Sequence, residues 1–322
     1  MTILLTRPDV EPLLHMPALL PQLRQAFRSY SLERSIPAQR VRSALPGGEH
    51  ASSATLLFPG LLPAIPAYTV KVHAKFPDQQ PAIQGVLLLH DLTTGQLLAI
   101  MDSTAITAVR TGLAGALAAD VLARPDASRV AIIGAGVQGQ LQLRCLALVR
   151  KLSQVWVYDV MSEKAKAFAE QMQTELNIPV LTAPSLIEAV KQAEIIVTVT
   201  WSRAPFLFAH MVQPGTHITT LGPDEPGKCE VAADLIRQGL FVCDDRNLAL
   251  TMGAPGGVGL GSEVVHAELG EILGVVRPGR TSDDQITIYG GVGLAFQDLV
   301  ACWHVYQQAK QQGEQRTIDF WV

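Results

Sequence analysis

Residues 129–150 read RVAIIGAGVQGQLQLRCLALVR, and this stretch decides the fold that the sequence predicts. An apolar run typical of a strand ends at Gly134, a glycine-rich turn continues to Gly139, and leucines at helical spacing follow. In a G-x-G-x-x-G turn between strand and helix, the first glycine allows the tight turn, the second lets the backbone approach a pyrophosphate, and the third lets the helix pack on the strand. The helix N-terminus supplies amides to the phosphates. The motif therefore predicts dinucleotide binding by Gly134, Gly136, Val137, Gln138 and Gly139.

A second predicted strand, Gln154–Tyr158, ends on Asp159, twenty residues after Gly139. A carboxylate at that place accepts hydrogen bonds from the adenosine ribose. The other interpretation, a structural glycine-rich turn, is disfavoured by these flanking elements. Asp159 favours NAD(H), because a carboxylate repels a 2′-phosphate and the next residues, Val160 and Met161, offer no cation. Use of NADP(H) is kept as the alternative.

The composition bounds the class of protein. A chain of 322 residues with 48% hydrophobic and 17% charged residues suggests about two domains with sizeable cores. The net charge of −4 gives no electrostatic reason to expect nucleic acid or an anionic membrane as a partner. The four cysteines are widely spread, so we expect reduced thiols and no metal site. We find neither a signal-peptide pattern nor an apolar run approaching a membrane span, and expect a cytoplasmic protein.

The order of predicted elements indicates two domains. Residues 39–98 have the texture of strands, including a hairpin with Thr93–Gly95 in its loop, and an alanine-rich helix covers Ser103–Leu122. Strands then alternate with helices, which predicts a doubly wound parallel sheet, a Rossmann α/β domain, over residues 123–293. A closing helix, Gly293–Gln312, returns to the first domain. That α+β domain is therefore discontinuous, comprising residues 1–122 and 294–322.

Four local expectations concern loops and helix ends. Ser35–Pro37 ends the first helix, and Ser162 caps the second helix of the Rossmann domain. Thr251–Gly261, with five glycines and a proline, is expected to be a flexible loop or lid, and Glu263–Leu273 a helix.

Isolated charges lie in apolar segments of the first domain. Lys71 interrupts the strand YTVKVHA, and Arg110 lies in the helix ITAVRTGLAG. A charge among apolar neighbours is costly unless it is paired, and a substrate carboxylate is one such partner. Arg42 lies in the predicted strand QRVRSAL beside Arg40. We expect Arg40 to face solvent.

Other polar residues are less decisive. His73 and His90 are expected to be strand or turn residues rather than acid–base groups. Asp224, in LGPDEPGKCE after a predicted strand, is either a turn aspartate or an acid at the sheet edge where ligands bind.

Five stretches of the sequence resemble one family: TAVRTGLAGALAADVLA, IIGAGVQGQLQ, EIIVTVTWSRAP, LGPDEPGKCEV and YGGVGLAFQDL. In this order, along nearly the whole chain, they are similar to the ornithine cyclodeaminase/mu-crystallin family. The resemblance implies a Rossmann domain and a discontinuous substrate-binding and dimerisation domain, and hence a homodimer. It also implies that hydride is exchanged between a nicotinamide cofactor and the α-carbon of an amino or imino acid.

The resemblance assigns roles to individual residues. Arg42, Lys71 and Arg110 match residues that bind the substrate carboxylate or polarise its α-nitrogen, and Arg110 also belongs to the cofactor side. Asp224 matches a catalytic proton donor or acceptor, which lowers the weight of the turn interpretation. Gly291 and Val292 match a Ser-Val pair that touches substrate, so glycine replaces serine here. The remaining cofactor residues, by resemblance, are Thr200, Thr220, Leu221, Gly222 and Lys228.

The reaction that we expect is reduction of a cyclic imine carboxylate, Δ1-pyrroline-2-carboxylate to L-proline or its six-membered homologue to L-pipecolate. Arg42 and Arg110 would hold the carboxylate, while Lys71 and Asp224 keep the ring nitrogen protonated. Ornithine cyclodeamination would require an acid near the substrate tail, and no acid is evident near Lys71 before Asp78. Alanine or another amino-acid dehydrogenase is a second alternative. A non-catalytic, nucleotide-dependent binding protein is the alternative from a different class.

Overall fold

The computed structural model describes residues 1–33, 40–45, 53–76, 79, 82–313 and 315–320. The chain divides into two compact units. Unit 1 comprises Met1–Arg110 and Leu294–Val322, and unit 2 comprises Thr111–Gly293. Helix α3 (Ser103–Leu122) contributes residues to both units.

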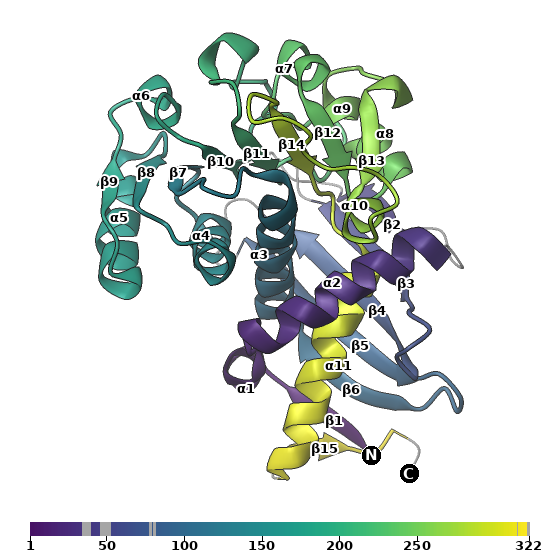
Figure 1. The fold of residues 1–322 in the computed structure, drawn as a ribbon. Coiled ribbons are helices and arrows are strands. Elements are labelled where there is room, and N and C mark those ends of the chain that lie inside the picture. The colour runs from purple at the N-terminus through teal and green to yellow at the C-terminus, as the bar shows by residue number, and fades with distance from the viewer. Residues whose placement is uncertain (34–39, 46–52, 77–78, 80–81, 314, 321–322) are drawn as a thin grey trace. The chain divides into compact units, whose positions relative to one another are not determined.

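Unit 2 is built on an eight-stranded sheet in which all neighbouring strands are parallel (Figure 1). The strand order is β13-β12-β14-β11-β10-β7-β8-β9. Its strands are β7 (Arg129–Ile133), β8 (Gln154–Tyr158), β9 (Val180–Thr182), β10 (Ile195–Thr198), β11 (His217–Thr220), β12 (Leu240–Cys243), β13 (Val265–Glu268) and β14 (Thr287–Gly290).

Its helices are α4 (Val137–Val149), α5 (Ser162–Leu176), α6 (Leu186–Val190), α7 (Ala233–Gln238), α8 (Arg246–Met252), α9 (Ala254–Gly257) and α10 (Leu269–Leu273). The predicted doubly wound parallel sheet is confirmed.

The chain reverses direction across this sheet between β7 and β10. From β7 the chain proceeds through β8 to β9 at one edge, whereas β10 and β11 lie on the other side of β7. In open α/β sheets ligands bind outside the carboxyl ends of the strands at such a switch point. All four residues of β10 are buried, as its apolar sequence indicates. Full burial of each such aliphatic side chain contributes about 1.5–3 kcal/mol.

Unit 1 contains a seven-stranded mixed sheet in the order β15-β1-β6-β5-β4-β3-β2. Its strands are β1 (Thr2–Leu5), β2 (Arg40–Ala44), β3 (Ser53–Gly60), β4 (Ala67–Lys75), β5 (Ile83–Asp91), β6 (Leu97–Asp102) and β15 (Thr317–Ile318). The helices that belong wholly to it are α1 (Arg7–Val10), α2 (Met16–Glu33) and α11 (Ala295–Gln312). The predicted hairpin is present as β5 and β6, with Asp91 accepting hydrogen bonds from the amides of Thr93 and Thr94.

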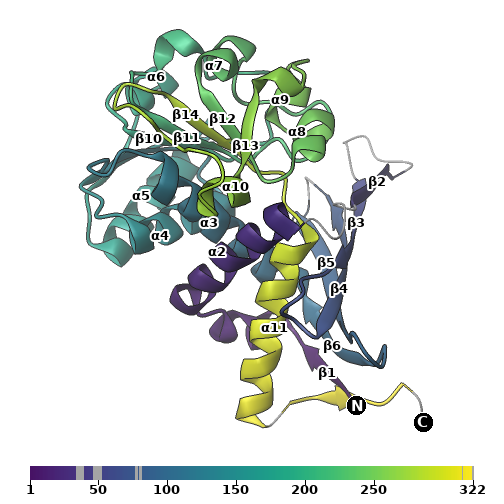
Figure 2. The same cartoon turned by 45° about the vertical axis from the view of Figure 1, so that its right-hand side comes forward.

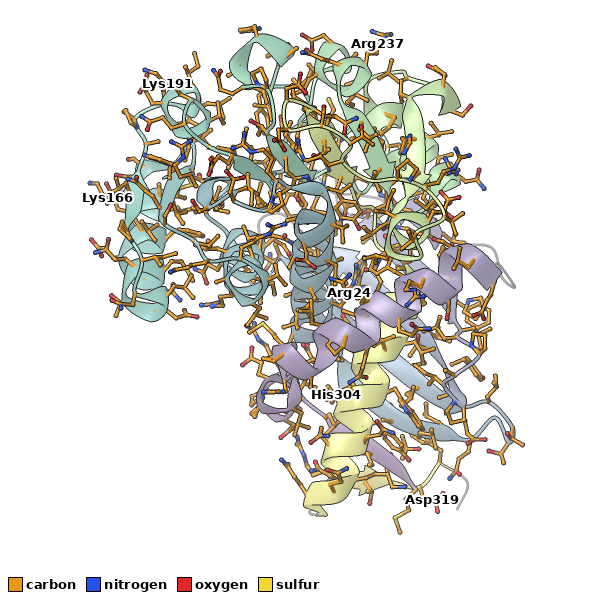
Figure 3. The ribbon with its side chains drawn as sticks, in the orientation of Figure 1. Arg24, Lys166, Lys191, Arg237, His304 and Asp319 are labelled. Atoms are coloured by element: carbon orange, nitrogen blue, oxygen red, sulfur yellow. The ribbon has the colours of Figure 1, made fainter. Side chains whose placement is uncertain are left out.

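Helix α11 packs on the sheet of unit 1 and joins α2 on the same face (Figure 2). The ring of Phe296 meets Phe27 edge-on and stacks on Tyr30, with centroids 5.1 and 4.8 Å apart. Further along α11, His304 lies beside α2, where its Nδ1 is 3.3 Å from Nε2 of Gln22 (Figure 3). The closing helix thus completes the core of the first unit, as its apolar stripe predicted.

Three local expectations were wrong. Residues 251–261 contain the end of α8 and all of α9 rather than a loop, because Asp245 caps α8 by accepting from Leu248 N, and Pro255 stands in the first turn of α9. Residues 263–273 form a short 3-10 turn, β13 and α10 rather than one helix. The residue that precedes α5 is Met161, not Ser162. The predicted helix end at Ser35–Pro37 lies outside the described residues.

Helix α3 is the one helix in the described parts of the chain that is long and apolar enough to cross a membrane. Its most apolar window has a mean hydropathy of 1.4 and is 67% buried inside the protein. The expectation that no apolar run approaches that length therefore fails on composition. Burial in the protein core accounts for the apolar sequence, as it does for many core helices.

Candidate functional site

The glycine turn between β7 and α4 has the geometry that a bound pyrophosphate requires. Gly134 has φ of +108°, and a Cβ there would lie 2.7 Å from Val199 O. A Cβ on Gly139 would lie 2.3 Å from Gly134 O, so this glycine allows helix α4 to pack closely. At Gly136, by contrast, a Cβ would meet nothing within 4 Å. The second glycine, which caps α4, thus leaves open space for a ligand at the helix N-terminus.

Asp159 follows β8 and is tied to this turn. Its Oδ2 accepts a hydrogen bond from Ala135 N at 2.8 Å, and its Oδ1 accepts from Met161 N at 2.9 Å. Two acceptor positions of the carboxylate are used in this way, and about two remain for ribose hydroxyls. The neighbouring Val160 is 89% exposed and presents no charge for a 2′-phosphate.

The ends of β10 and β11 are joined by a carboxylate that the sequence analysis did not single out. Glu230 is 0% exposed. It accepts hydrogen bonds from the side chains of Thr198, Thr200 and Thr220, and from the amides of Thr200 and Gly222. Three of the predicted cofactor residues, Thr200, Thr220 and Gly222, are therefore held in one network, and Leu221 lies between two of them.

Asp224 and Lys228 form an ion pair in the loop after β11. Lys228 Nζ lies 3.0 Å from Asp224 Oδ1 and 3.9 Å from Glu225 Oε1. It also lies 4.2 Å from the centroid of the Trp201 ring, a cation–π contact. The Asp224 side chain is 25% exposed, whereas that of Lys228 is 5% exposed. Asp224 is thus an accessible carboxylate held by a buried lysine, which a simple turn aspartate would not require.

Gly291 and Val292 follow β14, and a buried acid holds the backbone at Val292 and Gly293. Asp244 Oδ2 accepts from Val292 N at 2.9 Å and from Gly293 N at 2.6 Å. A Cβ on Gly291 would lie 2.8 Å from Leu221 Cδ2 and 2.9 Å from the Tyr289 hydroxyl. Gly291 is therefore matched to its neighbours, because Leu221 and Tyr289 occupy the space that a side chain there would use.

Unit 1 brings Lys71 and Arg110 together around Asp298. Lys71 Nζ is 3.2 Å from each carboxylate oxygen of Asp298, and Arg110 Nε is 3.1 Å from Oδ1. A second Arg110 nitrogen donates to Gln297 Oε1 at 2.8 Å. Lys71 is 1% exposed, Arg110 5% and Asp298 0%. The pairing that we sought for these two cations in a substrate is thus supplied in part by the protein itself.

Burial of Lys71 favours loss of its proton. Burial lowers its pKa from 10.5 to about 8, the Asp298 carboxylate opposes this shift, and the charges of Arg110 and Arg40 add to it. A lysine with a pKa near neutrality can both give and accept a proton at physiological pH. The cluster therefore has the properties of a proton-transfer site beside a guanidinium.

The expectation that Arg40 faces solvent was wrong. Arg40 is paired across the sheet with Leu57, and Leu57 with Lys71, so all three side chains project from the same face. Its Nε is buried, and its charge acts on Lys71. Arg42, the arginine assigned to the site from the sequence, lies two residues further along β2. It is paired with Thr55, which is paired with His73. The sequence alone does not give the strand register, so it could not show which of the two arginines shares a row with Lys71.

The histidines occupy the positions expected of them. His73 is buried on β4, and His90, on β5, stacks on Tyr68 with centroids 4.8 Å apart. Asp298 was missed because it lies 227 residues from Lys71 along the chain. Its signal was an acid within the predicted apolar closing helix. Glu230 gave a weaker signal, an acid in a Gly/Pro-rich loop.

A family model described as the ornithine cyclodeaminase/mu-crystallin family matches residues 1–313. The chain belongs to this family. An alanine dehydrogenase from Archaeoglobus fulgidus is 33% identical over 99% of this chain and 98% of the relative. A Delta(1)-pyrroline-2-carboxylate reductase from Bacillus cereus is 31% identical over 92% of this chain and 93% of the relative.

A solved structure gives the fold in detail. The Thermococcus litoralis Delta(1)-pyrroline-2-carboxylate reductase in complex with NADH and L-proline has a TM-score of 0.92 and 30% identity, over 98% of this chain and all of that one. Family members therefore share both units, and the resemblance read from the five sequence stretches is confirmed.

The glycine turn provides a matched pair of variants. Gly136→Val should abolish NADH binding and leave the melting temperature nearly unchanged, because its side chain would enter only the open space. Gly139→Ala should instead lower the melting temperature by several degrees, because its Cβ meets Gly134 O. Calorimetry and fluorescence titration with NADH measure both effects. Unimpaired NADH binding by Gly136→Val would contradict the assignment of this space to a pyrophosphate.

Proposed function

We propose that this protein is an NAD(H)-dependent reductase of a cyclic imine carboxylate, converting Δ1-pyrroline-2-carboxylate to L-proline or its six-membered homologue to L-pipecolate. The observation that carries the proposal is the buried cluster of Lys71, Arg110 and Asp298, in which a lysine with a pKa of about 8 lies beside a guanidinium. The similarity to a reductase solved with NADH and L-proline supports the same reaction class.

Unit 2 fits a dinucleotide. The open space at Gly136, the start of α4 and the free acceptor positions of Asp159 suit a pyrophosphate and an adenosine ribose. Thr200, Thr220, Leu221, Gly222 and Lys228 are the residues that we assign to its nicotinamide half. When bound, the cofactor supplies the hydride. The protein itself has to bind, orient and protonate the substrate.

Unit 1 supplies the groups that bind an imine carboxylate. Arg110 directs one nitrogen at Asp298 and another at Gln297, which leaves donors of its guanidinium for a substrate carboxylate. Arg40 or Arg42, on the same face of the sheet, adds a second cation. The protonated Lys71 then donates to the imine nitrogen, because an iminium accepts hydride far better than a neutral imine. Such proton transfer contributes about 10²–10⁴-fold.

Asp224, with Lys228, is the second proton-carrying group that we propose. Its carboxylate is the more exposed member of the pair. We assign Lys71 and Asp224 as catalytic residues, with Gly291 and Val292 bounding the substrate. The small side chains at residues 290–291 suit a compact ring.

Alanine dehydrogenase activity is the second candidate, and the 33% identical relative favours it. Reductive amination of a keto acid would use the same carboxylate-binding cations and the same proton donors. Ornithine cyclodeamination ranks lower, although the argument that no acid lies near Lys71 no longer holds. Asp298 does provide an acid near Lys71, yet it is buried and engaged by two cations.

The decisive assay measures NADH oxidation with Δ1-pyrroline-2-carboxylate and with pyruvate plus ammonia and, separately, proline formation from ornithine, in which the cofactor is recycled without net reduction. We expect turnover of the cyclic imine with kcat/KM at least tenfold above that for pyruvate plus ammonia. Faster turnover of pyruvate would favour alanine dehydrogenase. Binding of NADH without turnover of any substrate would support the non-catalytic alternative.

The pH dependence of the reduction should follow Lys71. Its protonated form is complete well below pH 8 and is lost as the pH rises through the pKa of about 8, so kcat/KM for imine reduction should fall above that pH. In Asp298→Asn the descending limb should move to lower pH, because the carboxylate that raises the pKa of Lys71 is gone. Asp102→Asn is the control, since Asp102 accepts hydrogen bonds from Thr104 instead. A limb that stays in place in Asp298→Asn would argue against Lys71 as the donor.

Cofactor choice should depend on Asp159. We expect the unmodified protein to prefer NADH over NADPH, and Asp159→Ser to reduce that preference by about tenfold or more, corresponding to ~1.4 kcal/mol of lost discrimination. Glu163→Ser removes an exposed charge from the first turn of α5 and should leave the preference for NADH over NADPH unchanged. The ratio of kcat/KM for the two cofactors is the measurement. A preference for NADPH in the unmodified protein would show that Asp159 does not select the cofactor.

We also propose that the protein is a homodimer that pairs through the outward face of the unit 1 sheet. Helices α2 and α11 of this unit lie on the other face (Figure 2). Four apolar residues on the outward face are paired in one row across strands β2 to β5: Val41, Leu56, Val72 and Val86. They are 62%, 37%, 46% and 42% exposed. An exposed apolar row of this kind marks an interaction surface.

The double variant Leu56→Glu/Val72→Glu should therefore be monomeric in analytical ultracentrifugation, because two carboxylates would be buried at the interface. Ile187→Glu, which replaces an exposed aliphatic residue of α6, should remain dimeric. A dimer that persists in the double variant would exclude this face.

We infer a reducing compartment such as the cytoplasm, since the four cysteines are buried thiols. Burial raises the pKa of Cys145 to about 12, so this thiol is unreactive.

A further inference from the structure

We propose that Glu230 is a positioning residue for the nicotinamide half of the cofactor site, an inference that rests on the proposed function. Its carboxylate connects the carboxyl ends of two adjacent strands. Oε1 accepts from Thr200 N at 2.6 Å and Thr200 Oγ1 at 2.7 Å, at the end of β10. Oε2 accepts from Thr198 Oγ1 at 2.7 Å, Thr220 Oγ1 at 2.8 Å and Gly222 N at 3.1 Å.

The seat of this carboxylate is shaped by a glycine. A Cβ on Gly222 would lie 2.3 Å from Glu230 Oε1 and 2.6 Å from Thr200 O. Any larger residue would displace either the carboxylate or the end of β10. Gly222 and Glu230 therefore form one structural unit, and the backbone of both strand ends is fixed by it.

Glu230 is itself anchored to the segment that follows β10. Its carbonyl accepts from Phe206 N at 2.9 Å and Leu207 N at 3.0 Å, and Cys229 N donates to Ser202 O at 3.1 Å. Lys228, two residues before Glu230, makes the cation–π contact with Trp201. The strand ends, Trp201 and the Asp224–Lys228 pair are thus fastened to one short segment, residues 228–230.

A charged group is a costly way to fill the core, because an ionised carboxylate is stable there only when several donors surround it. An apolar residue would pack between the strands at lower cost. Unlike an apolar residue, the carboxylate accepts hydrogen bonds from the backbone amides of Thr200 and Gly222. The backbone of Thr200 and Gly222, two of the residues assigned to the nicotinamide half, is thereby held in one position at the sheet edge. We therefore assign Glu230 to orienting this edge for nicotinamide, in addition to its packing.

A comparison of two ligands and two variants tests this role. NADH spans both halves of the site, whereas ADP-ribose carries the adenosine and pyrophosphate without nicotinamide. Glu230→Gln, which places an amino group against donors, should raise the Kd for NADH about tenfold or more and change that for ADP-ribose less than twofold. Glu194→Gln is the matched control, because Glu194 accepts from Ser128 N and Arg129 N beside the amino end of β10. It should alter neither Kd.

Fluorescence titration gives the Kd values, and calorimetry gives the melting temperature of each variant. The proposal would be overturned if Glu230→Gln raised the Kd values for NADH and ADP-ribose equally, or changed neither of them, whatever the change in melting temperature. If Glu230→Gln does not fold, Thr200→Val removes one donor and should still weaken NADH more than ADP-ribose; equal effects would again overturn it. Failure of the unmodified protein to bind NADH would instead reject the proposed function.

Discussion

The carboxylate of Asp298 is the constraint on which unit 1 depends. It is fully buried and paired with two buried cations, Lys71 and Arg110, from a strand and a helix distant in the sequence. Removal of one partner from such a buried group is strongly destabilising, by about 3–5 kcal/mol, because an uncompensated charge remains. The closing helix α11 must therefore return to this sheet. The discontinuity of the unit follows from a charge requirement as well as from apolar packing.

The same arrangement explains how a lysine stays reactive inside the protein. One carboxylate balances only part of the positive charge of Lys71 and Arg110, and Arg40 adds to the excess. One carboxylate for each cation would keep Lys71 protonated, whereas with no carboxylate nearby burial would favour the neutral amine. A substrate carboxylate would complete the balance, so substrate binding and the proton affinity of Lys71 are coupled in the proposed reaction.

In unit 2, carboxylates hold the main chain at places where strands end. Glu230 joins β10 to β11, Asp159 joins β8 to the glycine turn, and Asp244 holds the residues after β14. Each accepts from backbone amides that the strands leave unpaired. Apolar strands give this sheet its stability, while acidic side chains fix the edge at which ligands bind.

Local patterns were sufficient to predict much of this structure. The order of strand, G-x-G-x-x-G turn and helix, the β5–β6 hairpin and the stripe of α11 all depend on residues close in sequence. Contacts between distant residues were not predictable: the sequence gives no register for β2, so it does not show that Arg40 shares a row with Lys71, and it does not place Asp298 beside Lys71. At Thr251–Gly261, composition misled, because a capping aspartate outside the segment and a proline inside it start helices despite the glycines.

The central claim is that Lys71 is buried beside too little negative charge to keep its ordinary proton affinity. An NMR titration of the lysine side chains, with Lys71 assigned through a Lys71→Arg variant, tests it most directly. The account predicts that the Lys71 signal titrates with a pKa of about 8, and at lower pH in Asp298→Asn. A Lys71 pKa near the ordinary 10.5, unchanged in Asp298→Asn, would contradict it.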